Sequence, residues 1–199
     1  MSEKTPNGFN WSQYNERIEK RPPRELCVAG LELVAAYNSA LDFGAGSLTD
    51  TKQILEAGFE EVIAIDASED SQERANQIDS ESLTFVQTTF EDYDFPIEQF
   101  DFINAQNSIA FISRDAFNRV MNKLINSLKS QGVIAANFFG DKDEWNTPDT
   151  NKSFVTLDEV ENMFTDFSVI NLTEEEVDKP TALGHPKHWH IINLLAIKN

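Results

Sequence analysis

Short apolar runs alternate along the chain with longer segments of mixed polarity. Runs rich in β-branched and aromatic residues predict strands at 39–43, 61–66, 83–89, 100–106 and 132–139. Segments with helical spacing of their apolar residues lie between or beside them, at 24–37, 49–58, 68–79, 114–129 and 154–166. This alternation is typical of an α/β fold, with a mostly parallel sheet covered by helices on both faces.

The end of the chain departs from the alternation. Residues 168–177 and 189–198 both have the pattern of strands, and the segment between them has no helical spacing. A short connection without a helix favours an antiparallel return strand. We therefore expect the last strand to be antiparallel.

The N-terminal segment is separated from the rest by two prolines. Phe9, Trp11 and Tyr14 have weak helical spacing, and Pro22 and Pro23 end that element because proline cannot continue a helix. The sequence thus predicts an N-terminal helical or lid segment at 1–23 and one main domain at 24–199. The aromatic residues of this segment are candidates for a lid over the site.

Composition and charge narrow the possible partners. The 199 residues carry 16 Lys and Arg against 34 Asp and Glu, a formal net charge of −18. Such a chain would repel nucleic-acid phosphates and anionic membranes, and no apolar run is long enough to span a bilayer. Cys27 is the single cysteine, which excludes an internal disulfide, and no secretory signal pattern opens the chain. We expect a cytoplasmic protein, monomeric or a homodimer, with a small-molecule partner and with neither nucleic acid nor membrane.

A glycine turn follows the first predicted strand, in the stretch LDFGAGS. Gly44 and Gly46 would let the backbone approach a ligand closely. Asp66 ends the next strand, at a spacing that suits a carboxylate accepting hydrogen bonds from ribose hydroxyls. The alternative is an ordinary tight turn with a solvent-facing aspartate, and the combination of acid, turn, helix and second acid favours a cofactor site.

Two features of the turn distinguish between adenosine cofactors. A dinucleotide site generally needs a third glycine three positions after Gly46, which this chain lacks, and Asp42 would repel a pyrophosphate. S-adenosylmethionine has no phosphates, and a carboxylate attracts its ammonium group. The turn therefore favours S-adenosylmethionine over NAD.

These motifs resemble those of the class I S-adenosylmethionine-dependent methyltransferases. LDFGAG is similar to the first motif of that family, VIAIDAS to the second, FDFINAQNSIAFIS to the fourth-strand motif, and SLKSQGVIAANFFG to the helix and strand that follow. More narrowly, FEDYDFP, INAQNS and FFGDKDEW are similar to bacterial proteins grouped with tellurite-resistance methyltransferases. The resemblance implies a Rossmann-like, doubly wound sheet of seven strands with the last antiparallel. It also implies S-adenosylmethionine as cofactor and S-adenosylhomocysteine as product.

The resemblance also implies which residues hold the donor. They are Asp42, Gly44, Ala45, Gly46, Asp66, Ala67, Ser68, Phe90, Glu91, Asn104 and Ala105. Asp66 would hold the ribose, and Asp42 would support the amino group of the methionine part. Thr89 stands where the family often has an acid for the adenine, so Phe90 and Glu91 are assigned to that contact instead.

Candidate acceptor residues come from the ends of later strands. Gln106 and Asn107 end the fourth strand, and Trp145 lies in an acidic loop after the fifth; helix capping and a solvated loop are the plainer interpretations. All three histidines fall in GHPKHWH. His185 is a substrate candidate, while His188 and His190, with Trp145, are catalytic candidates; a structural role for the pair is the plainer interpretation, and without a third ligand we expect no metal site.

The sequence therefore predicts an S-adenosylmethionine-dependent methyltransferase that acts on a small-molecule acceptor. One alternative is a non-catalytic module that binds the donor and has a regulatory role. The other is an NAD-dependent oxidoreductase, against which Asp42 and the missing third glycine argue.

Overall fold

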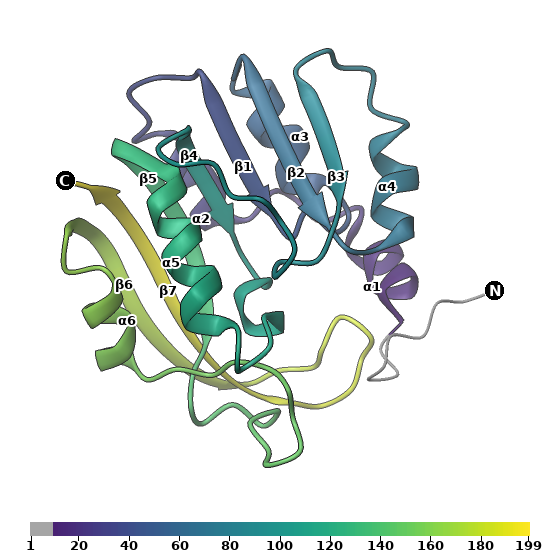
Figure 1. The fold of residues 1–199 in the computed structure, drawn as a ribbon. Helices are drawn as coiled ribbons and strands as arrows, with labels where there is room; N and C mark the ends of the chain where they lie inside the picture. Colours follow the sequence, from purple (N-terminus) through teal and green to yellow (C-terminus); the bar gives the residue numbers. More distant parts are fainter. Residues whose placement is uncertain (1–9) are drawn as a thin grey trace.

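The computed structural model describes residues 10–199 and contains a seven-stranded mixed sheet (Figure 1). The strands lie in the order β3-β2-β1-β4-β5-β7-β6. Their bounds are Ser39–Phe43 for β1, Glu61–Asp66 for β2, Leu83–Gln87 for β3, Phe100–Ala105 for β4, Leu128–Phe139 for β5, Phe167–Asp178 for β6 and His188–Lys198 for β7. This confirms the predicted fold class.

Strand direction follows the predicted scheme. The strands β1 to β5 pair in parallel, with β1 between β2 and β4. The last strand, β7, is antiparallel to both β5 and β6. The chain order reverses between β1 and β4, so their carboxyl ends form the crevice where open α/β sheets bind ligands.

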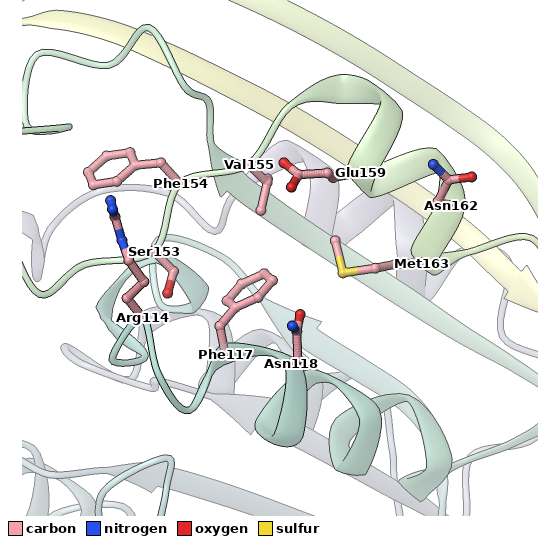
Figure 2. A pocket seen from close by; sticks show the side chains of 9 residues that line it. All are labelled: Arg114, Phe117, Asn118, Ser153, Phe154, Val155, Glu159, Asn162 and Met163. Atoms are coloured by element: carbon pink, nitrogen blue, oxygen red, sulfur yellow. The ribbon is translucent and has the colours of Figure 1, made fainter.

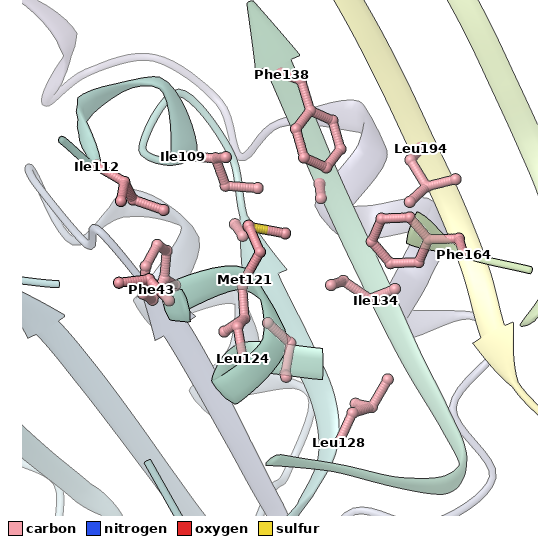
Figure 3. Packing of buried hydrophobic residues seen from close by; sticks show 14 of the residues in the cluster. Phe43, Ile109, Ile112, Met121, Leu124, Leu128, Ile134, Phe138, Phe164 and Leu194 are labelled. Atoms are coloured by element: carbon pink, nitrogen blue, oxygen red, sulfur yellow. The ribbon is translucent and has the colours of Figure 1, made fainter. Parts of the chain in front are cut away.

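Helices cover both faces of the sheet. Their bounds are Trp11–Ile18 for α1, Glu25–Leu31 for α2, Thr49–Glu56 for α3, Glu69–Ala75 for α4, Phe117–Ser127 for α5 and Leu157–Met163 for α6. Apolar residues of α2 and α3 pack on one face in a cluster that includes Val133 and Ala135 of β5. Residues of α5 and α6 pack on the other face, around Ile134 and Phe138 (Figure 3). The period-two alternation along β5 thus divides the core into two layers.

Local chain signals explain most of the element ends. The Thr156 hydroxyl accepts from the backbone N–H of Glu159, and the Glu159 carboxylate accepts from the backbone N–H of Thr156. The predicted capping box of α6 is therefore confirmed. The helix predicted at 24–37 ends earlier, at Leu31. Beyond it the backbone N–H groups of Leu33 and Val34 donate to carbonyls three residues before them, Gly30 and Leu31, which is the tighter 3₁₀ pattern. The break between the predicted helix at 114–129 and the predicted strand at 132–139 is present. The helix α5 ends at Ser127 and β5 begins at Leu128, but Gln131 has φ of +63° and the pairing with β4 passes from Leu128 directly to Val133.

Within residues 10–199, none of the helices has the length and apolar character required to cross a membrane.

Candidate functional site

The glycine turn lies at the carboxyl end of β1, between β2 and β4. Backbone N–H groups of Gly44 and Ala45 both donate to the carbonyl of Ile65, at 2.9 and 3.0 Å, which folds the turn against β2. Gly44 has φ of +84°, and a Cβ there would lie 2.4 Å from the Cβ of Ser108. Glycine is therefore required at this position by backbone conformation and by close packing.

Asp66 joins this turn to the end of β2. One carboxylate oxygen accepts from the backbone N–H of Gly46 and the other from that of Ser68, each at 2.9 Å. Burial raises the pKa of Asp66, while these two backbone donors oppose the rise. Each oxygen keeps a further lone pair, so the carboxylate can still accept from ligand hydroxyls.

A cavity of about 560 Å³ opens in front of this turn. The residues of its wall come from α1 and the segment after it, from the carboxyl ends of β1 to β4 and from the loop after β5. The lining residues are Trp11, Tyr14, Asn15, Ile18, Arg21, Arg24, Gly44, Ala45, Gly46, Ser47, Asp66, Ala67, Ser68, Thr88, Thr89, Phe90, Glu91, Gln106, Asn107, Ser108, Phe111 and Lys152. The volume lies within the range of small-molecule and cofactor sites.

The cavity contains most of the predicted donor residues. Eight of the eleven line it; Asp42, Asn104 and Ala105 do not. Both Asp42 oxygens are occupied, by the Thr51 hydroxyl at 2.5 Å and by the Asn104 amide at 2.8 Å. The Asn104 carbonyl then accepts from Gln106, which does line the cavity, so Asp42 reaches the site only through these amides.

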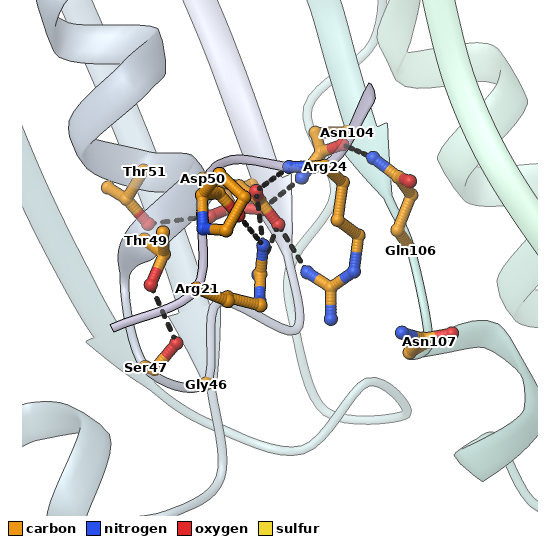
Figure 4. A network of polar contacts seen from close by, with 12 residues as sticks. Arg21, Arg24, Gly46, Ser47, Thr49, Asp50, Thr51, Asn104, Gln106 and Asn107 are labelled. Atoms are coloured by element: carbon orange, nitrogen blue, oxygen red, sulfur yellow. Dashed lines mark hydrogen bonds and ion pairs between the residues drawn. The ribbon is translucent and has the colours of Figure 1, made fainter. Parts of the chain in front are cut away.

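The segment after helix α1 is fixed to helix α3 by Asp50 (Figure 4). This buried carboxylate at the start of α3 accepts from the Arg21 guanidinium at 2.8 and 3.1 Å, from the Arg24 backbone at 2.9 Å and from the Arg24 side chain. Burial alone would raise the pKa of Asp50, but both arginines hold it below its ordinary value. The network places Arg21 and Arg24 on the cavity wall.

Three buried polar atoms of wall residues have no hydrogen-bond partner among the described residues. They are Asn15 Oδ1, in α1, Arg21 Nε, after α1, and Ser108 Oγ, after β4. Buried polar groups are normally paired, so unpaired atoms facing a cavity indicate a ligand that supplies the partner. Hydroxyl and ammonium donors of S-adenosylmethionine fit an amide oxygen and a hydroxyl of this kind.

The predicted catalytic and late substrate residues lie elsewhere. His190 is fully buried: its Nδ1 accepts from the backbone of Lys142 at 3.0 Å and its Nε2 lies 2.8 Å from Glu174. His188 is half-buried beside Asp178, and His185 is exposed in the loop before β7. None of these histidines lines the cavity, and neither does Trp145.

Trp145 belongs instead to an aromatic group at the edge of the site. Its ring lies 5.9 Å from that of Phe139 and 5.6 Å from that of Trp189, and these rings surround the ammonium of Lys187. Lys187 is buried and pairs with Asp143 at 2.5 Å. A fully paired charge of this kind fixes the loop after β5 rather than facing a ligand.

A second, smaller cavity of about 300 Å³ lies between α5 and α6 (Figure 2). Phe117, Val155 and Met163 supply much of its apolar wall, with Arg114 and Glu159 at its margin. It includes no residue of the glycine turn and neither Asp66 nor Glu91. The large cavity is therefore the candidate active site.

Sequence comparison assigns a family domain to the same region. Residues 40–132, which span the glycine turn, Asp66 and the end of β4, match a family described as a methyltransferase domain. None of the curated proteins matches the chain in sequence.

Solved structures with low sequence identity share the whole fold. TehB from Haemophilus influenzae has a TM-score of 0.76 at 14% identity, covering 96% of this chain and 68% of its own. The 1,6-didemethyltoxoflavin-N1-methyltransferase of Burkholderia thailandensis, solved with S-adenosylhomocysteine, has 0.64 at 20% identity, covering 88% and 77%. The [4+2]-cyclase SpnF has 0.63 at 14% identity, covering 87% and 79%. At these identities the likeness is one of fold.

Residues 40–132 thus match a methyltransferase domain, and the chain shares its fold with solved S-adenosylmethionine-dependent methyltransferases. The likeness to TehB extends over nearly the whole chain. The cavity beside the glycine turn is the candidate site for S-adenosylmethionine.

Several lining residues were not predicted from sequence. Asn15, Ser108 and Lys152 carry no motif that would separate them from other polar positions. Their common property is proximity in the folded chain, because they come from α1, from the turn after β4 and from the loop after β5. The aromatic residues of α1 were predicted as a lid: Trp11 and Tyr14 line the cavity, while Phe9 lies outside the described residues.

Proposed function

We propose that this protein transfers the methyl group of S-adenosylmethionine to a small-molecule acceptor. The observation that carries the proposal is that a single cavity continues from the turn after β1 to the loop after β5, with α1 along its wall. A pocket of about 560 Å³ that is partly lined by a helix suits a small acceptor beside the donor and leaves little room for a polymer.

The donor contacts follow from the positions of the wall residues. Asp66 would accept from the ribose hydroxyls, and Ala67, Ser68, Phe90 and Glu91 would surround the adenine. Backbone atoms of Gly44 to Gly46 would contact the methionine part, and Asn107 lies beside the Arg24 guanidinium, which can receive a carboxylate. When bound, S-adenosylmethionine supplies an electrophilic methyl group, and S-adenosylhomocysteine is the product.

The chain's own contribution is alignment and exclusion of water. Methyl transfer needs the acceptor atom in line with the sulfonium methyl, and holding two molecules in one cavity makes the encounter effectively unimolecular. Gln106, Asn107 and Phe111 lie beyond the donor turn, after β4, and would orient the acceptor. None of the three histidines lines the cavity, so the proposal needs no histidine base.

The test compares Asp66→Ala with Asp79→Ala, which removes an exposed carboxylate in the loop after α4. We expect Asp66→Ala to weaken S-adenosylhomocysteine binding about 10-fold or more in calorimetry, because charge-assisted hydrogen bonds are lost. Asp79→Ala should bind as the unaltered chain does. Acceptor pools would then be screened for formation of S-adenosylhomocysteine from the donor.

The outcomes separate the candidate functions. Equal affinity in both variants would show that Asp66 does not hold the ribose. Donor binding without turnover in any small-molecule pool would support a non-catalytic donor-binding module, an alternative consistent with the [4+2]-cyclase that shares the fold.

A further inference from the structure

Lys152 is the cation on the cavity wall that has no carboxylate partner among the described residues. The other lining cations, Arg21 and Arg24, are both paired with Asp50. Lys152 is half-buried, and no ion pair or hydrogen bond of its ammonium is present in the described part of the chain. A desolvated charge without a counter-ion is costly, so such a group in a cavity indicates a ligand of opposite sign.

Aromatic rings hold the Lys152 ammonium at the cavity. Its Nζ lies 5.6 Å from the centroid of Phe111 and 5.3 Å from that of Trp145. Cation–π attraction of this kind orients an ammonium without neutralising it, because neither ring carries a charge. The ammonium thus keeps its three donors for a ligand.

The backbone on each side of Lys152 is also fixed. Ser153 donates its N–H to the carbonyl of Ala110 at 2.9 Å and its hydroxyl to that of Ile112 at 2.9 Å. On the other side, the Arg114 N–H donates to the carbonyl of Asn151 at 3.2 Å. These bonds join the loop after β5 to the turn after β4, so Lys152 is held beside Phe111 by the fold.

Nearby charges do not satisfy this ammonium. The carboxylate that attracts Lys152 electrostatically is Asp143, which is already paired with the buried Lys187. Burial lowers the pKa of Lys152, and the Asp143 charge only partly opposes this. Glu91, another acid on the wall, accepts from the backbone and hydroxyl of Ser113 at 2.9 and 2.7 Å.

We propose that Lys152, flanked by Phe111 and Trp145, binds a negatively charged group of the methyl acceptor. Lys152 follows β5, whereas the donor turn follows β1 and Asp66 is the last residue of β2. The net charge of the whole chain gives this local cation a selective role. At −18 the protein repels anions, so an anionic acceptor needs a specific cationic contact. A cationic acceptor would be repelled by Lys152 at this position.

This inference rests on the proposed function, and its test separates the two. The protein saturated with S-adenosylhomocysteine is titrated with benzoate, benzamide and benzylammonium, three probes of similar size that differ in charge. The variant is Lys152→Met, which removes the charge and keeps the length of the side chain. The control is Lys123→Met, at an exposed position on α5.

We expect benzoate to bind more tightly than the other two probes, and Lys152→Met to weaken benzoate about 10-fold while leaving benzamide unchanged. S-adenosylhomocysteine affinity should be the same in the unaltered chain and in both variants. Once an acceptor is found, the variant should raise its KM more than it lowers kcat.

Four results would overturn the inference. The first three are the absence of benzoate binding to the protein saturated with S-adenosylhomocysteine, a preference for benzylammonium over benzoate, and the same benzoate affinity in Lys152→Met as in the unaltered chain. The fourth is a loss of S-adenosylhomocysteine affinity in Lys152→Met, which would assign Lys152 to the donor carboxylate. Failure of the unaltered chain to bind S-adenosylhomocysteine would instead contradict the proposed function itself.

Discussion

Asp42 is the last but one residue of β1 and is buried behind the donor turn. Burial raises the pKa of its carboxyl to about 6, and the negative charge of Asp50 adds to this, while hydrogen bonds from Thr51 and Asn104 oppose it. A carboxyl whose pKa is higher in the folded chain binds more protons there than in the unfolded chain. Its contribution to stability is therefore most favourable at low pH and declines as pH rises through about 6.

Replacing Asp42 by Asn should change the pH dependence of unfolding in a defined direction. As pH rises from about 4 to about 7, the unaltered chain should lose up to about 3 kcal/mol of unfolding free energy relative to Asp42→Asn. Any change in hydrogen bonding adds a constant offset, so the slope is the informative quantity. Urea unfolding at several pH values measures it, and Asp79→Asn serves as the exposed control.

Parallel pH profiles for Asp42→Asn and the unaltered chain would contradict the buried, proton-binding environment assigned to Asp42.

Individual site residues were predictable where a local motif marks them. Gly44, Gly46 and Asp66 lie at strand ends, and their positions follow from the chain pattern alone. Lys152 was not predictable, because its role depends on Phe111 and on a loop more than 40 residues away from that ring in sequence. None of the three histidines lines the cavity: His190 packs against Gly140, where a Cβ would lie 2.1 Å from its ring, while His188 lies beside Asp178 and His185 is exposed.

At the scale of elements, α1 is the helix that depends most on its contacts. Asn15 donates to Asp70 of α4 at 2.9 Å, Arg74 pairs with Glu19 at 3.1 Å, and Arg21 pairs with Asp50. A helix of 8 residues has little stability by itself, so these contacts position it. Its residues Trp11, Tyr14, Asn15 and Ile18 then complete the cavity wall.

Removing residues 1–20 should weaken S-adenosylhomocysteine binding about 10-fold or more, because the cavity would lose this wall and Asn15. A variant lacking only residues 1–9 is the matched control, and calorimetry measures both. Equal affinity of the two shortened chains would show that α1 takes no part in donor binding. Circular dichroism would confirm that both shortened chains fold.

Element types were predictable, whereas their ends were less so. Period-two and helical patterns identified the strands and the α2 to α6 helices, because each buries one face. The early end of α2 at Leu31 could not be predicted, since the buried Val34 continues the apolar pattern although its backbone N–H bonds over three residues rather than four. Likewise, no residue near Ser127 signals that Leu128 already pairs with β4, ahead of the turn at Gln131.

At the scale of the molecule, the sheet brings distant segments to one edge. The carboxyl ends of β1 to β4 line one cavity, together with Lys152 of the loop after β5, because these strands are parallel and adjacent in the order β3-β2-β1-β4-β5. The parallel arrangement and the antiparallel last strand were predictable from alternation and from the resemblance. The cavity itself was not, because it needs the packing of α1 and of the loop after β5.

Thermal unfolding with added ligands tests the donor site most directly. Measured with S-adenosylhomocysteine, S-adenosylmethionine, NAD and buffer alone, the two adenosyl ligands at about 100 times their dissociation constants should stabilise the protein by about 2.7 kcal/mol. That corresponds to a rise in Tm of roughly 5–10 °C for a chain of this size, with no rise for NAD. A rise with NAD alone, or with none of the ligands, would contradict the assignment of the cavity to S-adenosylmethionine.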